Sequence, residues 1–152
     1  MDAAFRLLTE RLDAKFRLLM KMVPVLAEDI PDDSPKGGVY LFSEYGSHLY
    51  AGRTKGKLAT RIRSHFGSAL DCPLAWQIAR ERTGHRATYK KEGSRKDLLA
   101  RPDFRRIYDE SKQRIRKMQV RYVEEADPLR QALLEIYTAV VSGAKHNDFD
   151  TH

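Results

Sequence analysis

The sequence predicts an α+β fold, in which a small sheet of three strands is flanked by helices and an extra helix stands at the N-terminus. Two short runs of strand-forming residues are separated by a turn sequence, and a third alternating run comes late in the chain. Around these runs, apolar residues recur every three or four positions, which is typical of amphipathic helices. A chain of 152 residues is long enough for one domain with its own core.

Residues 3–22 are predicted to form an amphipathic helix that ends before Pro24. Its apolar residues recur at spacings of three and four: Phe5, Leu8, Leu12, Phe16, Leu19 and Val23. Because this pattern lasts fewer than three heptads, it favours packing on the protein's own core over a coiled-coil dimer seam. A homodimer formed through this helix is the alternative. We therefore divide the chain into an N-terminal helix, residues 1–27, and a main domain, residues 28–152.

A β-hairpin is predicted after a linker at residues 28–37, which is rich in proline, aspartate and glycine. Residues 39–42 and 48–51 form the two strands, because both runs are apolar and contain strand-forming tyrosines. Residues 44–47 have the composition of the connecting turn. A second turn is expected at residues 54–56.

Two helices and a polar loop are predicted to follow the hairpin. Residues 57–66 form the first helix, whose core-facing stripe contains Leu58, Ile62 and Phe66. Residues 71–73 break this pattern, and 74–82 form a second short helix. Residues 83–96 are polar, poorly periodic and interrupted by glycines, so we expect a loop there.

The last third of the chain predicts helix, strand and helix. Residues 102–116 form a basic helix, and 118–123 alternate well enough for the third strand. Asp127 and Pro128 carry the signature of a helix N-terminus, with an aspartate cap and a proline in the first turn. Gly143 is expected to end this final helix.

The positive charge of the chain is concentrated in one segment. The net charge is +7, and residues 77–121 hold 15 lysines and arginines against 6 aspartates and glutamates. Such a field favours a polyanionic partner, most commonly nucleic acid, over the alternative of a merely solvated helix face. The segment has few aromatic residues for base stacking, so sequence-specific readout of bases is not inferred.

Membrane insertion and disulfide bonding are not expected. No run approaches the roughly 20 apolar residues that span a bilayer, and no secretory leader is recognisable at the N-terminus. Cys72 is the only cysteine, so it has no partner within the chain for a disulfide or a cysteine-rich zinc site. These observations predict a cytoplasmic protein.

Two tyrosines and two basic residues are candidates for chemistry. Tyr40 and Tyr50 lie in the tripeptides Gly38-Val39-Tyr40 and Tyr50-Ala51-Gly52, whose first glycine and first tyrosine are twelve positions apart. Arg61 and His65 are four residues apart, which places them on one face of the predicted helix, opposite its core-facing stripe. Arginine binds phosphate through two hydrogen bonds, and histidine can move a proton or hold a tyrosine hydroxyl. The alternative is a set of packing tyrosines, a surface arginine and a capping histidine.

A phenol is a poor base at neutral pH unless nearby cations lower its pKa. Such cations are available close by in the sequence: Arg53, Lys55, Arg61 and Arg63. Glu135 interrupts an apolar stretch of the final predicted helix, so it either faces solvent or holds a metal ion. One carboxylate suits Mg²⁺, whose shell is completed by water and substrate oxygens.

Other carboxylates compete with Glu135 for a metal. Glu124 and Glu125 stand at the end of the third predicted strand. The C-terminal residues with weak metal-binding potential are His146, Asn147, Asp148, Asp150 and His152.

Together, the two tripeptides with Arg61, His65, Glu135 and Asn147 resemble the GIY-YIG nuclease superfamily over residues 37–150. The resemblance implies a small three-stranded antiparallel sheet flanked by helices, and a DNA endonuclease that uses Mg²⁺ or Mn²⁺. Val39 and Ala51 replace isoleucines, and Gly56 is one extra residue before the helix.

The resemblance also implies a role for each residue. Tyr40 would be the general base toward water, Tyr50 and His65 would support it, and Arg61 would bind the scissile phosphate. Glu135 would hold the single metal ion. The residues expected to contact nucleic acid are Arg53, Lys55, Arg63 and Asn147. A non-catalytic nucleic-acid-binding module with the same fold is the alternative.

Overall fold

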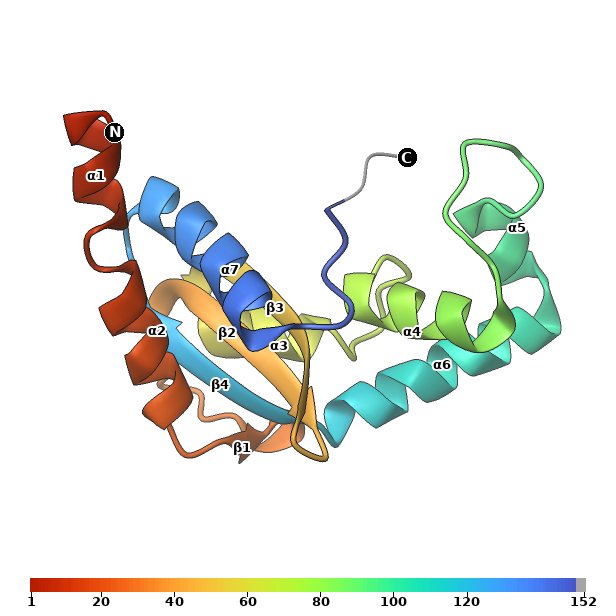
Figure 1. Cartoon of the computed structure of the whole chain (residues 1–152). Helices are drawn as coiled ribbons and strands as arrows, with labels where there is room; N and C mark the ends of the chain where they lie inside the picture. The colour runs from red at the N-terminus through yellow and green to blue at the C-terminus, as the bar shows by residue number, and fades with distance from the viewer. Residues whose placement is uncertain (150–152) are drawn as a thin grey trace.

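The computed structural model describes residues 1–149, which form a four-stranded antiparallel sheet with helices on both faces (Figure 1). The strands are β1 (Val25–Leu26), β2 (Lys36–Glu44), β3 (Ser47–Lys57) and β4 (Gln119–Glu124), in the spatial order β1-β4-β2-β3. The α+β class is confirmed, but the prediction of three strands misses β1. This strand has only two residues, too few for an alternating pattern to be seen. No helix among residues 1–149 is long and apolar enough to cross a membrane.

Two N-terminal helices replace the single predicted one: α1 (Ala3–Thr9) and α2 (Leu12–Lys21). The Thr9 hydroxyl donates a hydrogen bond to the Arg6 carbonyl, a side-chain bond that competes with continuation of the helix. In α2, Leu19 is fully buried and the Phe16 ring meets the Tyr137 ring edge-on at 5.6 Å. The apolar stripe of α2 therefore packs within the chain, whereas α1 has no buried residue.

The β2–β3 hairpin is longer than the sequence predicts. Tyr45 and Gly46, both with positive φ, form its two-residue turn. Of the linker expected at residues 28–37, residues 28 and 29 belong to the short 3₁₀ helix η1 (Ala27–Asp29), and β2 already begins at Lys36. The turn expected at residues 54–56 is wrong, because these residues belong to β3. Lys36 pairs with Lys57, whereas Gly38 pairs with Thr54. Between these two pairs β3 therefore has one residue more than β2, which it accommodates as a β-bulge.

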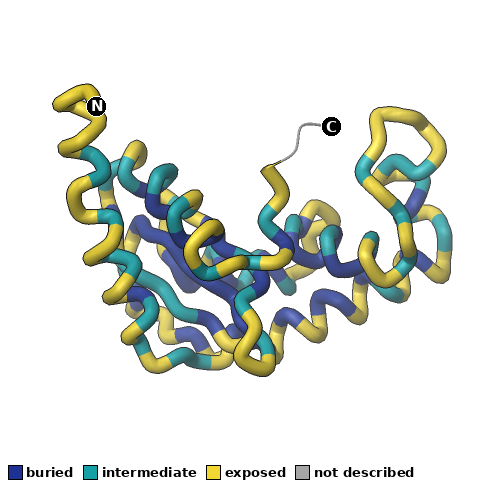
Figure 2. The backbone as a smooth tube through the Cα atoms, viewed as in Figure 1, coloured by how far each residue is buried: buried dark blue, intermediate teal, exposed yellow. Residues whose placement is uncertain are grey.

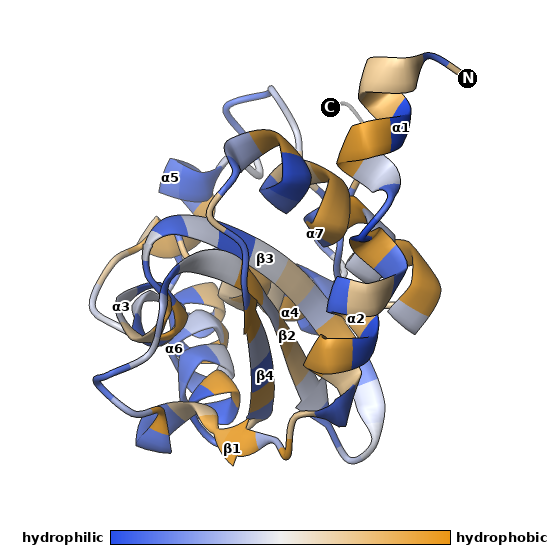
Figure 3. Cartoon of the chain, turned by 90° about the vertical axis from the view of Figure 1, so that its left-hand side faces the viewer, coloured by the Kyte–Doolittle hydropathy of each residue, from blue (hydrophilic) through white to orange (hydrophobic). Residues whose placement is uncertain are grey.

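Helices cover the two faces of the sheet (Figure 3). On one face lie α2 and α7 (Pro128–Ser142), which enclose a small core of Leu19, Leu41, Ala51 and Ala139. On the other lies α3 (Leu58–Ser64), over a larger core that continues into α4 (Pro73–Thr83) and α6 (Pro102–Arg116). The helix predicted at 102–116 is confirmed at both ends. Asp127 caps α7 through a hydrogen bond from Arg130 N at 2.9 Å, and Gly143 ends it, as expected.

A helical arm extends sideways from the sheet (Figure 1). It consists of α4, α6 and the short helix α5 (Arg95–Ala100), with residues 84–94 forming a loop between α4 and α5. Most residues of this loop are exposed to solvent, as Figure 2 shows. The arm therefore displays most of the basic segment at residues 77–121.

Candidate active site

Tyr40 and Tyr50 project from the same face of the sheet. Tyr40 lies opposite Gly52 and Phe42 lies opposite Tyr50 in the register of β2 and β3. Directly opposed residues, and residues two apart on one strand, share a face. Both tyrosines consequently point toward α3, and each ring centroid lies 5.4 Å from that of His65.

The glycines of the two tripeptides allow close approach. A Cβ on Gly52 would stand 2.3 Å from both Cζ and Oη of Tyr40, so only glycine leaves room for this ring. A Cβ on Gly38 would stand 2.2 Å from the carbonyl oxygen of Val123 on the neighbouring strand β4. Each tripeptide glycine thus makes space for a specific neighbour.

His65 lies inside the protein, where it separates the two tyrosines. Its Nε2 is 2.6 Å from the Tyr40 hydroxyl oxygen, and only 1% of the residue is exposed. The expectation that Arg61 and His65 face away from the core is wrong for His65. Residue 65 follows Leu58 by seven positions, which is two helical turns, so both lie on the inner face. His65 follows α3 directly and keeps helical backbone angles.

Burial keeps His65 neutral. Burial, assisted by the positive charge of Arg61, lowers the pKa of His65 to about 3. Its second ring nitrogen, Nδ1, is buried without a hydrogen-bond partner among the described residues. An imidazolium here would carry an unpaired N–H in an apolar pocket, which is costly. His65 is therefore suited to hold Tyr40 in place and unsuited to store a proton.

The Tyr40 hydroxyl is enclosed, whereas Tyr50 reaches an open pocket. Tyr40 has no exposed surface, and burial, together with the neighbouring Tyr50, raises its pKa. Burial and the negative charge of Glu135 also raise the pKa of Tyr50, but this residue is only partly buried. The Arg61 guanidinium opposes both rises.

Tyr50 and Glu135 line the same pocket, of about 280 Å³, at the outer edge of β3, which is the last strand of the sheet. The pocket is completed by residues from β3, α4 and the C-terminal tail: Ala51, Pro73, Gln77, His146, Asn147, Asp148 and Phe149. Burial raises the pKa of Glu135, against the opposing charges of Arg53 and Arg61. Arg53 Nε lies 4.0 Å from Glu135 Oε1, at the limit of an ion pair. The carboxylate is thus desolvated but weakly partnered.

A desolvated, weakly partnered carboxylate beside an open pocket fits the single-carboxylate mode in which proteins hold Mg²⁺. The competing carboxylates lie elsewhere, since neither Glu124 nor Glu125 lines this pocket, and Glu125 accepts a hydrogen bond from Asp127 N. Within residues 1–149, no three His, Cys, Asp or Glu side chains are grouped to hold a metal. Asp150 and His152 of the weaker C-terminal candidate lie outside the described residues.

Asn147 ties the C-terminal tail to the sheet. Its Oδ1 accepts a hydrogen bond from Ala51 N at 2.8 Å, and its Nδ2 donates one to Ala51 O at 2.8 Å. The backbone amides of Lys145 and His146 donate to the carbonyls of His48 and Leu49. The tail therefore follows the edge of β3 like a further strand. The structure gives Asn147 a positioning role that engages both ends of its amide, and its expected contact with nucleic acid stays a prediction.

The other predicted phosphate contacts divide into two groups. Arg53 and Lys55 lie on β3 and are exposed near the pocket side of the strand. Arg63 is occupied, because its guanidinium bonds to Asp32 Oδ1 at 2.6 Å and to the Ile30 carbonyl at 2.7 Å. Arg63 therefore ties α3 to the segment before β2, and we no longer expect it to contact nucleic acid.

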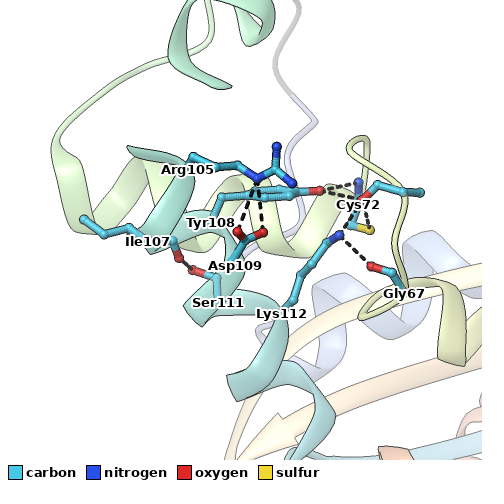
Figure 4. A network of polar contacts seen from close by, with 9 residues as sticks. Gly67, Cys72, Arg105, Ile107, Tyr108, Asp109, Ser111 and Lys112 are labelled. Carbon is cyan, nitrogen blue, oxygen red and sulfur yellow. Dashed lines mark hydrogen bonds and ion pairs between the residues drawn. The ribbon is translucent and has the colours of Figure 1, made fainter. Parts of the chain in front are cut away.

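A polar network beneath the site holds the loop that follows His65 (Figure 4). Lys112 is buried in α6 and donates hydrogen bonds to the carbonyls of Gly67 and Ala69, each at 2.5 Å. The Tyr108 hydroxyl bonds to Ala69 O and accepts from Cys72 N, both at 3.2 Å. The burial of Lys112 was not predicted from the sequence. The apolar residues Phe104, Ile107 and Tyr108 predict which face of the helix is buried, but a lysine gives no such indication.

Comparisons of the chain with protein-family models, with curated proteins and with solved structures find no match. The nuclease resemblance therefore rests on the residues of the sequence and stays a prediction.

Proposed function

We propose that this chain is a metal-dependent DNA endonuclease of the GIY-YIG type. The observation that carries the proposal is the shared pocket of Tyr50 and Glu135, beside the hydrogen-bonded pair of Tyr40 and His65. Arg61 acts electrostatically on Tyr40, Tyr50 and Glu135, so one cation serves the whole group. A phenol and a partly desolvated carboxylate at one opening, with a guanidinium whose charge acts on both, suit the hydrolysis of a phosphodiester.

Tyr50 is the better candidate for the base that contacts the attacking water. The sequence resemblance implies Tyr40, but its hydroxyl is enclosed and already bonded to His65. In the proposed mechanism, Tyr50 first loses its own proton to solvent and then, as a phenolate, takes a proton from the attacking water. The water oxygen bonds to phosphorus while the P–O bond to the leaving strand breaks, and the leaving oxygen takes a proton from solvent. Tyr40 and His65 fix the ring packing behind Tyr50. Arg61 stabilises the phenolate of Tyr50 and the charge on the phosphate.

Glu135 would hold the metal ion. When bound there, Mg²⁺ or Mn²⁺ supplies charge stabilisation for the phosphate oxygens and cancels the negative charge that raises the Tyr50 pKa. Arg53 is close enough to orient the Glu135 carboxylate. Arg53 and Lys55 then meet neighbouring backbone phosphates along β3.

The test is a nicking assay with supercoiled plasmid, branched DNA and single-stranded DNA in Mg²⁺ or Mn²⁺. We expect cleavage by the wild type, loss of cleavage in Glu135→Gln, and the same DNA affinity for both proteins. Glu124→Gln is the matched control, because it removes an exposed carboxylate outside the pocket. Cleavage by Glu135→Gln at the wild-type rate would exclude the metal assignment.

The second candidate is a non-catalytic nucleic-acid-binding module, which the enclosure of Tyr40 and the basic arm favour. It predicts DNA binding without product on any of the three substrates and with either metal. Dimerisation through the N-terminus remains a separate proposal. It would have to use α1, where Phe5 and Leu7 are exposed, because α2 packs on the protein itself.

A further inference from the structure

Two guanidinium groups converge on the same tryptophan in the helical arm. Arg80 Cζ lies 4.9 Å from the centroid of the Trp76 ring, and Arg95 Cζ lies 5.3 Å from it. Arg80 is one turn beyond Trp76 on α4, and Arg95 comes from α5 across the loop. The tryptophan is almost fully buried, so its ring forms a fixed platform. Two cations held against one platform repel each other unless an anion lies between them.

Several carboxylates of the arm pair with other arginines. Arg82, Arg105 and Arg106 each form an ion pair with Asp109 or Glu110.

The surroundings of Arg80 leave part of its hydrogen-bonding capacity unused. Burial, followed by the charge of Arg95, lowers the pKa of Arg80. The negative charge of Asp148 in the C-terminal tail acts in the opposite direction. Arg80 Nε is buried and has no hydrogen-bond partner among the described residues. Burial and the neighbouring Arg95 thus act against the charge of Arg80, and its Nε–H is a donor that a bound acceptor could use.

A small pocket opens beside the two arginines. It has a volume of about 300 Å³ and is lined by Arg80, Ala87, Thr88, Tyr89 and Arg95. The Tyr89 ring is 85% exposed and stands beside the cations on the loop. Guanidinium groups offer paired donors to a phosphate, and an exposed aromatic ring offers a face to a nucleobase. The pocket therefore offers a phosphate contact and a base contact close enough together for a single nucleotide to reach both.

We propose that Arg80 and Arg95 form a binding site for a backbone phosphate of a nucleic acid strand, with Tyr89 stacking on an adjacent base. The site adjoins the candidate active site along α4, because Gln77 of the Tyr50–Glu135 pocket lies one turn, about 5 Å, before Arg80. The strand would thus run from the scissile phosphate along α4 to the arm. This placement relative to the scissile phosphate rests on the proposed function, whereas the phosphate site itself does not.

The salt dependence of binding tests the site directly. Affinity for a fluorescent single-stranded oligonucleotide is measured by anisotropy at several salt concentrations in EDTA, where no cleavage occurs. Each phosphate contact contributes about 0.7 to the slope of log affinity against log salt for a single strand. Because the two arginines share one phosphate, we expect Arg80→Gln/Arg95→Gln to lower the slope by about 0.7 and to weaken binding at least tenfold. Arg80→Lys/Arg95→Lys should keep the slope, because the charges remain.

Arg6→Gln/Arg11→Gln is the matched control. It removes the same charge from α1 and the residue before α2, at the other end of the molecule from α5 (Figure 1). This control should keep the wild-type slope. Equal slopes for the Arg80/Arg95 variant and the wild type, with the same thermal midpoint, would overturn the proposal. If the wild type binds with the expected slope but cuts nothing, the proposed function fails and the phosphate site stands.

Trp76 supplies a second readout, because it is the only tryptophan in the chain. A phosphate that draws the guanidinium groups toward itself changes the field at the indole ring. We expect a saturable change in tryptophan emission when the wild type is titrated with the unlabelled oligonucleotide, and none with Arg80→Gln/Arg95→Gln. Unchanged wild-type emission at concentrations that saturate the anisotropy would place the bound strand elsewhere and overturn the proposal.

Discussion

The phenol of Tyr40 fills the space that any side chain on Gly52 would need. A Cβ on Gly52 would be 2.3 Å from the Tyr40 hydroxyl oxygen, and the two residues pair directly across β2 and β3. The first tripeptide thus depends on the glycine of the second. Because Tyr40 also bonds to His65, the same contact fixes the position of the histidine and of the loop behind it.

Gly52→Ala should destabilise the protein by about 1–3 kcal/mol, because the fully buried Tyr40 ring has no room to move away from the new methyl group. The free energy of unfolding from urea titration measures this change. Gly56→Ala on the same strand is the control, since its nearest atom would be 3.7 Å away. We expect the control to change stability by about 0.5 kcal/mol or less. Equal stability of the two variants would contradict the steric argument.

Tyr50→Phe should reduce the cleavage rate by about 10²–10⁴-fold, because the substitution removes the phenol that faces the pocket. Tyr40→Phe should cost less activity, since its hydroxyl is enclosed and serves to hold His65. Single-turnover rates of plasmid nicking give the comparison, with DNA affinity measured in parallel. A larger loss in Tyr40→Phe than in Tyr50→Phe would return the role of base to Tyr40.

The order of helices and strands could be predicted because each element carries its own local signal. The Asp127 cap, Pro128 and Gly143 bound α7 in the sequence as they do in the structure. The short strand β1 carries no such signal, since its two residues are placed by pairing with β4. The bulge in β3 also escaped prediction, because it depends on the register against β2.

For the candidate site, the sequence predicted which residues take part better than it predicted how buried they are and what they contact. Tyr50 and Glu135 do meet at one pocket, although they are 85 positions apart in the sequence. The enclosure of Tyr40 and the burial of His65 depend on tertiary packing, which spacing along a helix does not reveal. The Arg80–Trp76–Arg95 cluster was hidden for the same reason, since α5 brings Arg95 back over α4.

Arg61→Gln should lower the cleavage rate by about 10²–10³-fold, because the guanidinium is the cation that acts on both tyrosines. Arg63→Gln is the matched control from the same helix. Its guanidinium is engaged with Asp32 and the Ile30 carbonyl, so its loss should lower the thermal midpoint and leave the rate unchanged. Equal rates for the two variants would remove Arg61 from the reaction.

His65 should make the protein less stable in acid. Its pKa is lowered to about 3 in the folded state, whereas an exposed histidine has a pKa of about 6.5. Between these values the unfolded chain binds a proton that the folded chain rejects, so stability is lost as the pH falls. The expected loss from His65 is about 1.4 kcal/mol per pH unit below pH 6. Urea titrations of wild type and His65→Gln at pH 4–8 measure it, because His48 and His146 contribute equally to both proteins. Parallel curves for the two proteins would contradict the burial of His65.

Asn147→Ala should release the C-terminal tail from the edge of β3. The substitution removes the two 2.8 Å hydrogen bonds to the buried residue Ala51, whose amide and carbonyl then need water as their partner. Amide hydrogen exchange at Ala51, measured by NMR, should accelerate by about tenfold or more, which corresponds to about 1.4 kcal/mol of lost protection.

Asn147→Asp is the informative comparison, because it keeps the acceptor for Ala51 N and loses the donor to Ala51 O. We expect Ala51 in this variant to exchange at an intermediate rate. Since Asp148 and Phe149 of the tail line the pocket with Tyr50, release of the tail should also widen the candidate active site. Unchanged protection of Ala51 in Asn147→Ala would show that the backbone bonds of Lys145 and His146 hold the tail without the asparagine.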